Sequence, residues 1–325
     1  PCAWWLLPAW LGEGPSDDPW AFVASRVADR SAEDVVERAR LLGLAAAVAV
    51  EPDPVPAPWQ RDGARGAPQA ERARARPLVI DLSALWAGPL CAHLLGLAGA
   101  RVVKVESTRR PDGARFGPTP FYDLLNAGKQ SVALDFGTPE GRERLRHLVE
   151  CADIVVESAR PRALLQLGLD AASLVEALPG LTWVSITGYG RSGPGANWVA
   201  FGDDAGVAAG LATATGRAAG TPLFCGDAIA DPLTGLHAAL AALASWSQGG
   251  GQLVELALRD VVAHALAFAQ PAEVAGVRGG RDAWEVVVGT RRERVAPPRS
   301  RSPRERARPL GADTDAVLRE LGISC

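Results

Sequence analysis

Five short apolar runs between residues 78 and 187 constrain the fold more than any other feature of this 325-residue chain. Each run is continuously apolar, which is typical of a strand buried on both faces of a parallel sheet. Segments with helical spacing separate the runs, and this alternation indicates a doubly wound α/β sheet. The runs are LVIDLS (78–83), ARVVKVE (100–106), SVALDF (131–136), DIVVES (153–158) and LTWVSIT (181–187). Residues 77–268 are therefore predicted to form one large α/β domain.

The segment ahead of this domain, residues 1–57, follows a different pattern. Helical spacing at 20–27 and 32–42 predicts two helices, and Ser31 is the expected N-cap of the second. The apolar stretch at 45–50 predicts a short strand. This segment does not resemble the start of a parallel α/β domain.

Residues 58–76 are rich in Pro, Arg, Ala and Gly, and this composition predicts a linker. At the other end, residues 269–325 predict a strand at 284–288, a basic loop and a terminal helix at 313–321. Neither end of the chain is apolar enough to bury a core alone. We expect the two ends to pack together as one small α+β domain, within one subunit or across a dimer.

Composition argues against several classes of protein. No run approaches the roughly 20 apolar residues that a membrane span needs. The formal net charge of −3 gives no sign of the basic surface that nucleic-acid-binding proteins carry. The apolar opening at 2–11 lacks a basic region, so no signal peptide is expected. Five scattered cysteines indicate reduced thiols and a cytoplasmic location. The four histidines are equally scattered, and no metal site is expected.

The segment TPLFCGDAIADPLTGLH (221–237) holds two aspartates four residues apart, Asp227 and Asp231. Asp231 precedes Pro232 and a long apolar stretch, so we interpret it as the N-cap of a helix. One hypothesis is that Asp231 only caps this helix. The other is that the helix start keeps its carboxylate ionised for use as a covalent nucleophile. The local pattern leaves both hypotheses open.

Two loops follow strand ends, where α/β proteins usually bind ligands. Residues 188–193 match G-x-G-x-x-G, but Pro194 and the absent helical spacing argue against a dinucleotide site and favour a tight turn. Arg109, Arg110 and Arg115 follow the second strand and are candidates for binding phosphates. The alternative for each arginine is an ordinary solvated side chain. A Ser-His-Asp hydrolase is not favoured, because the chain has no G-x-S-x-G elbow.

Several segments together resemble the family III CoA-transferases, a group that includes α-methylacyl-CoA racemase as a close branch. They occur in family order over roughly residues 77–264: VIDLSALWAGPLCAHLLGLAGARVVKVE, LNAGKQSVALDF, ADIVVESARPRALLQLGLD, SITGYGRSGP, ADPLTGLHAALAAL and GGGQLVELALRD. The resemblance implies a Rossmann-like large domain, a small domain and two subunits interlocked like links. It also implies that CoA thioesters are substrates and that no cofactor is permanently bound.

The resemblance places the catalytic aspartate of the family at Asp231. There the carboxylate attacks an acyl-CoA, forms a mixed anhydride and then an aspartyl-CoA thioester, and passes CoA to a second carboxylic acid. The residues expected to bind CoA and substrate are Trp86, Ala87, Arg109, Arg110, Arg115, Lys129, Ser158, Gly188, Tyr189, Gly190 and Asp204.

This chain departs from the family pattern at three places. Trp86 stands where transferases often carry Gln, and Ser158 lies where their usual Glu-Asn-Phe segment has Asn. The racemase branch has Gly-His-Asp where this chain has Asp203 before Asp204. The layout also differs, because residues 19–57 and 295–323 resemble small-domain and carboxyl-terminal segments of the family. The chain therefore resembles a rearranged family member.

Three functions are compatible with these observations. The leading hypothesis is an enzyme that moves CoA between an acyl-CoA and a carboxylic acid, with Asp231 as nucleophile. The second is an acyl-CoA racemase or isomerase that uses Asp231 as an acid/base group. The third is a CoA-binding subunit without activity of its own. The expected assembly is a homodimer or a hetero-oligomer.

Overall fold

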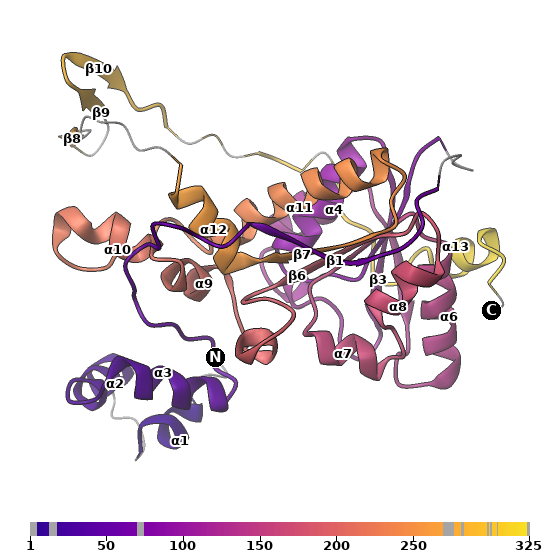
Figure 1. Cartoon of the computed structure of the whole chain (residues 1–325), viewed down its shortest axis with the longest axis horizontal. Helices are drawn as coiled ribbons and strands as arrows, with labels where there is room; N and C mark the ends of the chain where they lie inside the picture. Colours follow the sequence, from indigo (N-terminus) through magenta and orange to yellow (C-terminus); the bar gives the residue numbers. More distant parts are fainter. Residues whose placement is uncertain are drawn as a thin grey trace.

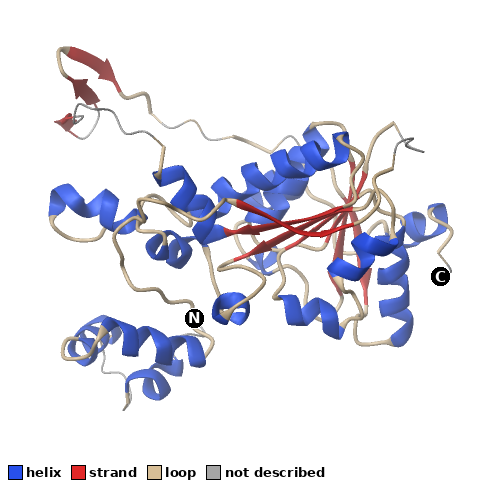
Figure 2. Ribbon diagram, in the orientation of Figure 1, coloured by secondary structure: helices blue, strands red, loops and turns tan. Residues whose placement is uncertain are grey.

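The computed structural model describes residues 5–12, 18–69, 75–268, 276–280, 283–297, 299, 301–303 and 305–323. A seven-stranded sheet lies at the centre, with strand order β1-β7-β6-β5-β2-β3-β4 and helices on both faces (Figures 1 and 2). The pairs among β2 to β7 are all parallel. These strands are β2 (Leu78–Asp81), β3 (Arg101–Ser107), β4 (Gln130–Leu134), β5 (Ile154–Glu157), β6 (Thr182–Thr187) and β7 (Gln252–Ala257). The predicted α/β fold is confirmed.

The two faces of the sheet carry separate apolar cores because strand side chains alternate in direction. On β5, Val156 packs into one core and Val155 into the other. The helices of the first face are α4 (Ala87–Leu97), α9 (Gly202–Ala208), α11 (Ala230–Ser247) and α12 (Leu258–Leu266). Those of the second face are α6 (Pro139–Glu150), α7 (Pro161–Gln166), α8 (Ala171–Ala177) and α13 (Thr314–Glu320). The runs are continuously apolar because both faces are covered.

Short elements complete the loops at the carboxyl ends of the strands. They are the helices α5 (Thr119–Asn126) and α10 (Leu211–Gly216), and the 3-10 turns η2 (Gly113–Phe116), η3 (Pro194–Asn197) and η4 (Arg217–Ala219). In the part of the chain that the structure describes, no helix combines the length and apolarity needed to cross a bilayer.

The predicted linker contains a strand, β1 (Gln60–Arg65), which is a correction to the sequence analysis. It pairs antiparallel with β7, from Gln60 opposite Leu256 to Arg65 opposite Gln252, and forms one edge of the sheet. An antiparallel edge strand on a parallel sheet is common in α/β folds. Residues 70–74 of the linker lie outside the described residues.

The N-terminal segment forms a small helical unit of α1 (Leu7–Leu11), α2 (Pro19–Val27) and α3 (Ala32–Leu41). Its helices pack around Leu7, Leu11 and Phe22. Ser31 caps α3 as predicted, because its Oγ accepts a hydrogen bond from the Asp34 N–H at 3.1 Å. The strand predicted at 45–50 is wrong, since these residues carry no regular secondary structure.

The C-terminal segment divides into two parts. A three-stranded antiparallel sheet is formed by β8 (Gly276–Gly280), β9 (Ala283–Val288) and β10 (Arg291–Arg294). Helix α13 instead packs beside β4, where Asp313 Oδ2 accepts the Ser131 N–H at 2.9 Å. Figure 1 shows the β8–β10 sheet apart from α1–α3. Their association across two subunits stays a prediction, and residues 269–275 lie outside the described residues.

Candidate functional site

Asp231 lies in the first turn of α11, a helix that begins two residues earlier than expected, at Ala230 instead of Pro232. The predicted N-cap role is wrong, because Ile229 occupies that position without a side-chain cap. The Asp231 carboxylate faces other elements instead. Its Oδ1 accepts a hydrogen bond at 3.2 Å from the N–H of Ala87, the first residue of α4. The carboxylate therefore joins two helices of the same sheet face.

A second backbone group approaches the same carboxylate from α9. The Gly202 N–H donates a hydrogen bond to it. A Cβ at Gly202 would lie 2.4 Å from Asp231 Oδ2 and 2.3 Å from the Ala228 carbonyl oxygen. Only glycine permits so close an approach. The carboxylate is thus held by backbone N–H groups from two separate segments, an arrangement suited to stabilising negative charge.

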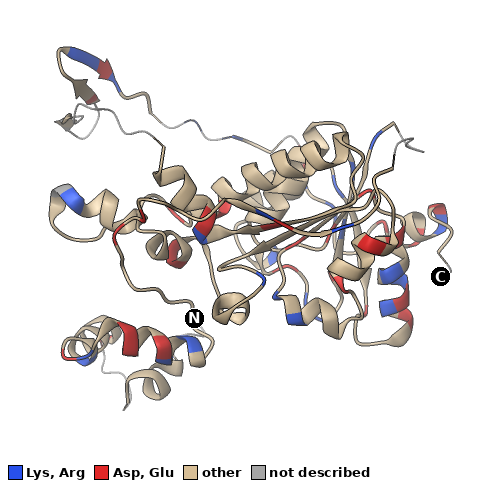
Figure 3. Cartoon of the chain, in the orientation of Figure 1, with Lys and Arg blue, Asp and Glu red and all other residues tan. Residues whose placement is uncertain are grey.

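Burial raises the pKa of Asp231 to about 6. The N–H groups of Ala87 and Gly202 act in the opposite direction, and the neighbouring carboxylates of Asp203 and Asp204 raise the pKa further. In Figure 3, α4 and α11 are almost entirely tan, so few Lys, Arg, Asp or Glu residues lie on these two helices. The carboxylate is therefore ionised near neutral pH but poorly solvated, which favours reaction with an electrophile.

The two loops that meet at the carboxylate are strained. Leu85 has φ 69° and Ala228 has φ 45°, and in the described chain they are the two non-glycine residues with positive φ. Leu85 lies two residues before Ala87, and Ala228 lies three before Asp231. Such conformations cost free energy and concentrate at functional sites. Their position here marks the Asp231 surroundings as a site.

Hydrogen bonds from neighbouring elements hold the loop before α4. Ser158, after β5, accepts the Ala84 N–H on Oγ at 3.1 Å, and Asp112 Oδ1 accepts the Leu85 N–H at 3.0 Å. Trp86, at the N-cap of α4, packs edge-on against Phe121 with ring centroids 5.0 Å apart. Of the residues predicted to bind substrate, Ser158 and Trp86 are therefore placed beside the Ala87 N–H.

Lys129 lies beneath this loop in a buried ionic network. Its Nζ contacts Asp81 at 2.8 Å, the Pro89 carbonyl oxygen at 2.9 Å and Asn126 Oδ1 at 3.0 Å. Burial lowers the pKa of Lys129 to about 8, while Asp81 acts to raise it. All three ammonium protons have partners, so these contacts join the end of β2, the first turn of α4 and the end of α5. Whether Lys129 also touches CoA stays a prediction.

The three arginines of the predicted phosphate loop have different surroundings. Arg109 forms an ion pair with Asp135 at 2.8 Å. Arg115 forms a bidentate pair with Glu106 at 2.5 Å and is largely buried. Arg110 is exposed, and no ion pair joins it to the part of the chain described here. It is the arginine of this loop most available to a phosphate.

The glycine-rich loop after β6 positions Tyr189 and Asp204. The Tyr189 hydroxyl donates to Asp204 Oδ2 at 2.6 Å, and Asp204 Oδ1 accepts the Phe201 N–H at 2.6 Å. Burial raises the pKa of Asp204. A Cβ at Gly188 would lie 2.1 Å from the Ala200 Cβ, and Gly190 has φ 106°, so this loop requires its glycines. The chain bends at Gly188 and Tyr189, and residues 191–201, which include η3, connect this bend to Gly202.

Sequence reasoning missed two groups near this loop. The Arg40 guanidinium, from α3, lies 3.6 Å from the centre of the Trp198 ring and brings the N-terminal unit to the site. Glu157, at the end of β5, accepts the Ser185 hydroxyl at 2.5 Å and pairs with Arg191 at 3.3 Å. Burial raises the pKa of Glu157 to about 7. In the sequence, Glu157 could have been found only as a glutamate at the end of an apolar strand.

No group of three or more metal-ligating side chains has binding geometry within the described ranges. His237 and His264 pack as aromatic rings around Trp59, with centroids 5.1 Å and 6.3 Å from it. The candidate site therefore consists of the Asp231 carboxylate and the N–H groups of Ala87 and Gly202.

Relatives with known names match this chain over part of their length. The succinate–glutarate CoA-transferase of Agrobacterium fabrum is 35% identical over 206 residues, which cover 58% of this chain and 52% of that protein. The formyl-CoA:oxalate CoA-transferase of Escherichia coli is 32% identical over 195 residues, covering 57% and 47%. The chain spans about half the length of these relatives.

A solved structure also resembles this chain. A CAIB/BAIF family protein from Brucella suis superimposes with a TM-score of 0.57 and 30% identity, covering 65% of each chain. A comparison with protein families matches residues 77–297 to the family described as CoA-transferase family III. That range holds the whole parallel sheet, the Asp231 carboxylate and both of its backbone donors. The chain belongs to CoA-transferase family III.

Proposed function

We propose that this chain transfers CoA between an acyl-CoA and a carboxylic acid through a covalent intermediate on Asp231. The observation that carries the proposal is the Asp231 carboxylate, held by the N–H groups of Ala87 and Gly202 in a member of this family. The names of the two relatives describe CoA-transferases. Incubating the purified chain with a panel of acyl-CoA donors and carboxylate acceptors tests the activity directly.

The proposed reaction passes through two covalent intermediates on Asp231. Asp231 attacks the thioester carbonyl carbon, and the CoA thiolate leaves as a mixed anhydride forms. The thiolate then attacks the Asp231 carbonyl carbon and releases the first acid, which leaves an aspartyl-CoA thioester. A second carboxylate repeats the sequence in reverse and regenerates Asp231. The N–H groups of Ala87 and Gly202 are placed to stabilise the oxyanion that develops on Asp231 when CoA attacks it.

The pH dependence follows from the raised pKa of Asp231. The nucleophile is the deprotonated carboxylate, so protonation below a pKa of about 6 removes activity. We expect kcat/KM to be flat above about pH 7 and to fall roughly tenfold per pH unit below about pH 6. Initial rates across this range, with a donor whose own groups do not titrate there, measure the profile. A profile without a break near pH 6 would contradict the assignment.

The phosphates of CoA are proposed to bind at the loop that carries Arg110. We expect the Arg110→Glu variant to weaken CoA binding by about fivefold and to flatten its salt dependence, because a screened phosphate contact is lost. The matched control is Arg146→Glu, an exposed arginine on α6. Calorimetry at several salt concentrations measures the affinity for CoA, and the same measurement with NAD tests for dinucleotide binding. Heat from NAD with none from CoA would reject the proposed binding site.

A racemase or isomerase remains a second candidate because Asp203 lies beside Asp231. Epimerisation next to a thioester needs one proton-accepting group on each face of the carbon. The charge of Asp203 acts to raise the pKa of Asp231, so these two carboxylates are the pair to test. Deuterium exchange into a 2-methylacyl-CoA, at a rate comparable with CoA transfer, would place this function first.

The assembly is part of the proposal. We propose that α1–α3 of one subunit and the β8–β10 segment of another meet in a homodimer, or that a second polypeptide completes the site in a hetero-oligomer. Light scattering of the purified chain gives its oligomeric state. Transfer activity that appears only after a second polypeptide is added would make this chain a non-catalytic CoA-binding subunit.

A further inference from the structure

The N-terminal helical unit reaches the candidate site through Arg40 on α3. Its guanidinium lies 3.6 Å from the centre of the Trp198 ring and 5.5 Å from that of the Tyr189 ring. These two rings pack edge-on, with their centroids 5.3 Å apart. The Arg40 Nε also donates to the Ala46 carbonyl oxygen at 3.1 Å, which holds the guanidinium in this position. A cation held over two aromatic rings in a partly buried position makes a specific contact.

The same guanidinium acts on the Tyr189 hydroxyl. Arg40 donates a hydrogen bond to this oxygen, and the hydroxyl itself donates to Asp204 Oδ2 at 2.6 Å. Burial raises the pKa of Tyr189, so the hydroxyl keeps its proton and remains a donor. Burial raises the pKa of Asp204 as well, whereas the charge of Arg40 acts to lower it. Arg40 therefore favours the ionised Asp204 carboxylate, which is the stronger acceptor of hydrogen bonds.

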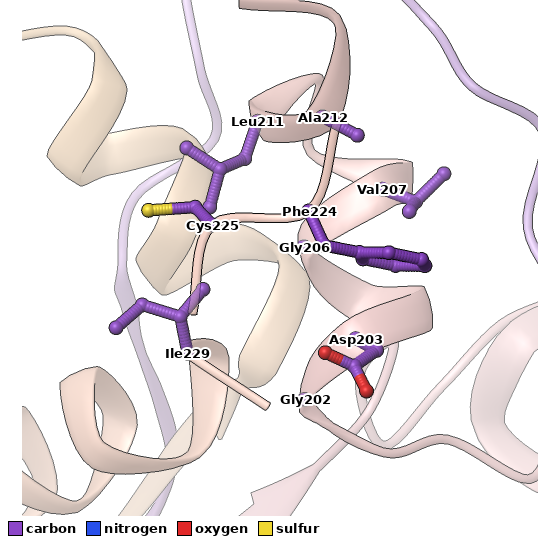
Figure 4. A pocket seen from close by; sticks show the side chains of 9 residues that line it. All are labelled: Gly202, Asp203, Gly206, Val207, Leu211, Ala212, Phe224, Cys225 and Ile229. Carbon is purple, nitrogen blue, oxygen red and sulfur yellow. The ribbon is translucent and has the colours of Figure 1, made fainter. Parts of the chain in front are cut away.

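Asp204 passes this constraint to the start of α9. Its other carboxylate oxygen, Oδ1, accepts the N–H of Phe201, the N-cap residue of α9, at 2.6 Å. The next N–H along the chain, that of Gly202, donates to the Asp231 carboxylate. Figure 4 shows Gly202 at the start of α9 and Ile229 where the chain enters α11. Because the two N–H groups are consecutive, a shift at Phe201 moves the Gly202 donor as well.

We propose that Arg40 is a positioning residue for the Asp231 carboxylate. It acts through the Tyr189 hydroxyl and the Asp204 carboxylate on the N–H of Gly202. The inference rests on the proposed function, because it concerns how that N–H is aimed at the nucleophile. The N-terminal helical unit is then required for turnover, and Tyr189 and Asp204 orient the site instead of binding the substrate.

The contact at the end of this chain of hydrogen bonds tolerates little displacement. A Cβ at Gly202 would lie 2.4 Å from Asp231 Oδ2, so the backbone of α9 is already close to the carboxylate. A shift at the start of α9 therefore changes the distance between donor and nucleophile, which affects the reaction more than substrate binding. Loss of Arg40 should lower kcat and leave KM nearly unchanged.

The first measurement uses the Arg40→Ala and Tyr189→Phe variants of the full chain. We expect kcat to fall about tenfold in each variant, which corresponds to the loss of about one charge-assisted hydrogen bond. KM for the acyl-CoA should stay within about twofold. Tyr189→Phe keeps the ring that faces Arg40, so it remains informative if thermal unfolding shows that Arg40→Ala disturbs the N-terminal unit.

The matched control is Arg38→Ala, which removes an arginine from the same helix. Arg38 Nη2 donates to the Ala9 carbonyl oxygen at 2.8 Å, inside the N-terminal unit. This variant should leave kcat unchanged. The double variant Arg40→Ala/Tyr189→Phe should lose no more than either single variant, because both substitutions break the same chain of hydrogen bonds.

The second measurement does not depend on turnover. Hydrogen–deuterium exchange, resolved to single amides by mass spectrometry, reports how firmly the N–H groups of Phe201 and Gly202 are held. Both should exchange about tenfold faster in Arg40→Ala and in Tyr189→Phe than in the wild-type chain. In Arg38→Ala their exchange should be unchanged.

The outcomes separate this inference from the proposed function. Unchanged kcat in both variants, a rise in KM with kcat unchanged, or an equal loss in Arg38→Ala overturns the positioning role. Losses that add in the double variant also overturn it. If the wild-type chain transfers no CoA but both N–H groups exchange faster in Arg40→Ala and Tyr189→Phe, the proposed activity fails and the positioning role stands. If their exchange is unchanged, Arg40 does not position Gly202.

Discussion

Replacing Asp231 by Asn is expected to lower CoA transfer at least about 10³-fold while leaving CoA affinity within a few-fold. Asn has nearly the same shape as Asp, so α11 and the Ala87 contact are kept, but it cannot form an anhydride. Asp231→Ala should have the same effect on turnover. Steady-state rates and calorimetry with CoA measure the two quantities separately. Loss of CoA binding together with activity would indicate damage to the fold instead.

The covalent intermediate on Asp231 can be observed directly. Incubation of the wild-type chain with an acyl-CoA, followed by hydroxylamine, should convert the activated carboxyl group to a hydroxamate that peptide mass analysis locates at Asp231. Asp227 and Asp204 provide an internal comparison, because both belong to the same acidic neighbourhood in sequence or space. A hydroxamate on either of them would reject Asp231 as the nucleophile.

The Gly202→Ala variant is expected to lose about 100-fold in turnover and about 1–3 kcal/mol in stability. The added Cβ would lie 2.4 Å from Asp231 Oδ2 and 2.3 Å from the Ala228 carbonyl oxygen. The Ala228 oxygen belongs to the backbone, so the start of α9 and the loop before α11 must move apart, and the Asp231 carboxylate is displaced with them. Movement of the Gly202 N–H misplaces the nucleophile. Thermal unfolding and initial rates measure the two losses.

Gly206→Ala is the matched control for stability, since it changes the same residue type one turn later in α9. Its added Cβ would have its nearest neighbours at 3.8 and 3.9 Å, which are ordinary contacts. We expect the Tm to stay the same or to rise, because alanine favours the helix by up to about 1 kcal/mol over glycine. A Gly202→Ala variant with unchanged Tm and turnover would show that the close approach is not needed.

The parallel sheet could be predicted from the sequence because each strand carries its own signal. A strand covered on both faces is continuously apolar, as in LVID at 78–81, and this needs no knowledge of its neighbours. Strand β1 could not be found in this way. Its sequence, QRDGAR, is polar and contains glycine, and it is a strand only because the edge of β7 offers hydrogen bonds to its backbone.

The site shows the same limit. The sequence indicated that Asp231 lies near the start of a helix, but it predicted the wrong N-cap and none of the partners of the carboxylate. Ala87 lies 144 residues away in sequence, and Gly202 approaches through a loop whose course depends on Tyr189 and Asp204. Lys129 was predicted to bind CoA, and nothing in the sequence indicated its burial beside Asp81, which is 48 residues away. Pairing between distant residues leaves no local pattern to recognise.

The pairing of β1 with β7 has a consequence for the order in which this protein can fold during synthesis. Asp62, on β1, and Gln252, on β7, are joined across 190 residues. At a ribosomal rate of about 5–20 residues per second, β1 waits roughly 10–40 s for its partner to be made. An apolar strand left unpaired for that time is prone to aggregate with other nascent chains. The polar residues of β1 reduce that hazard until β7 has been made and the two strands can pair.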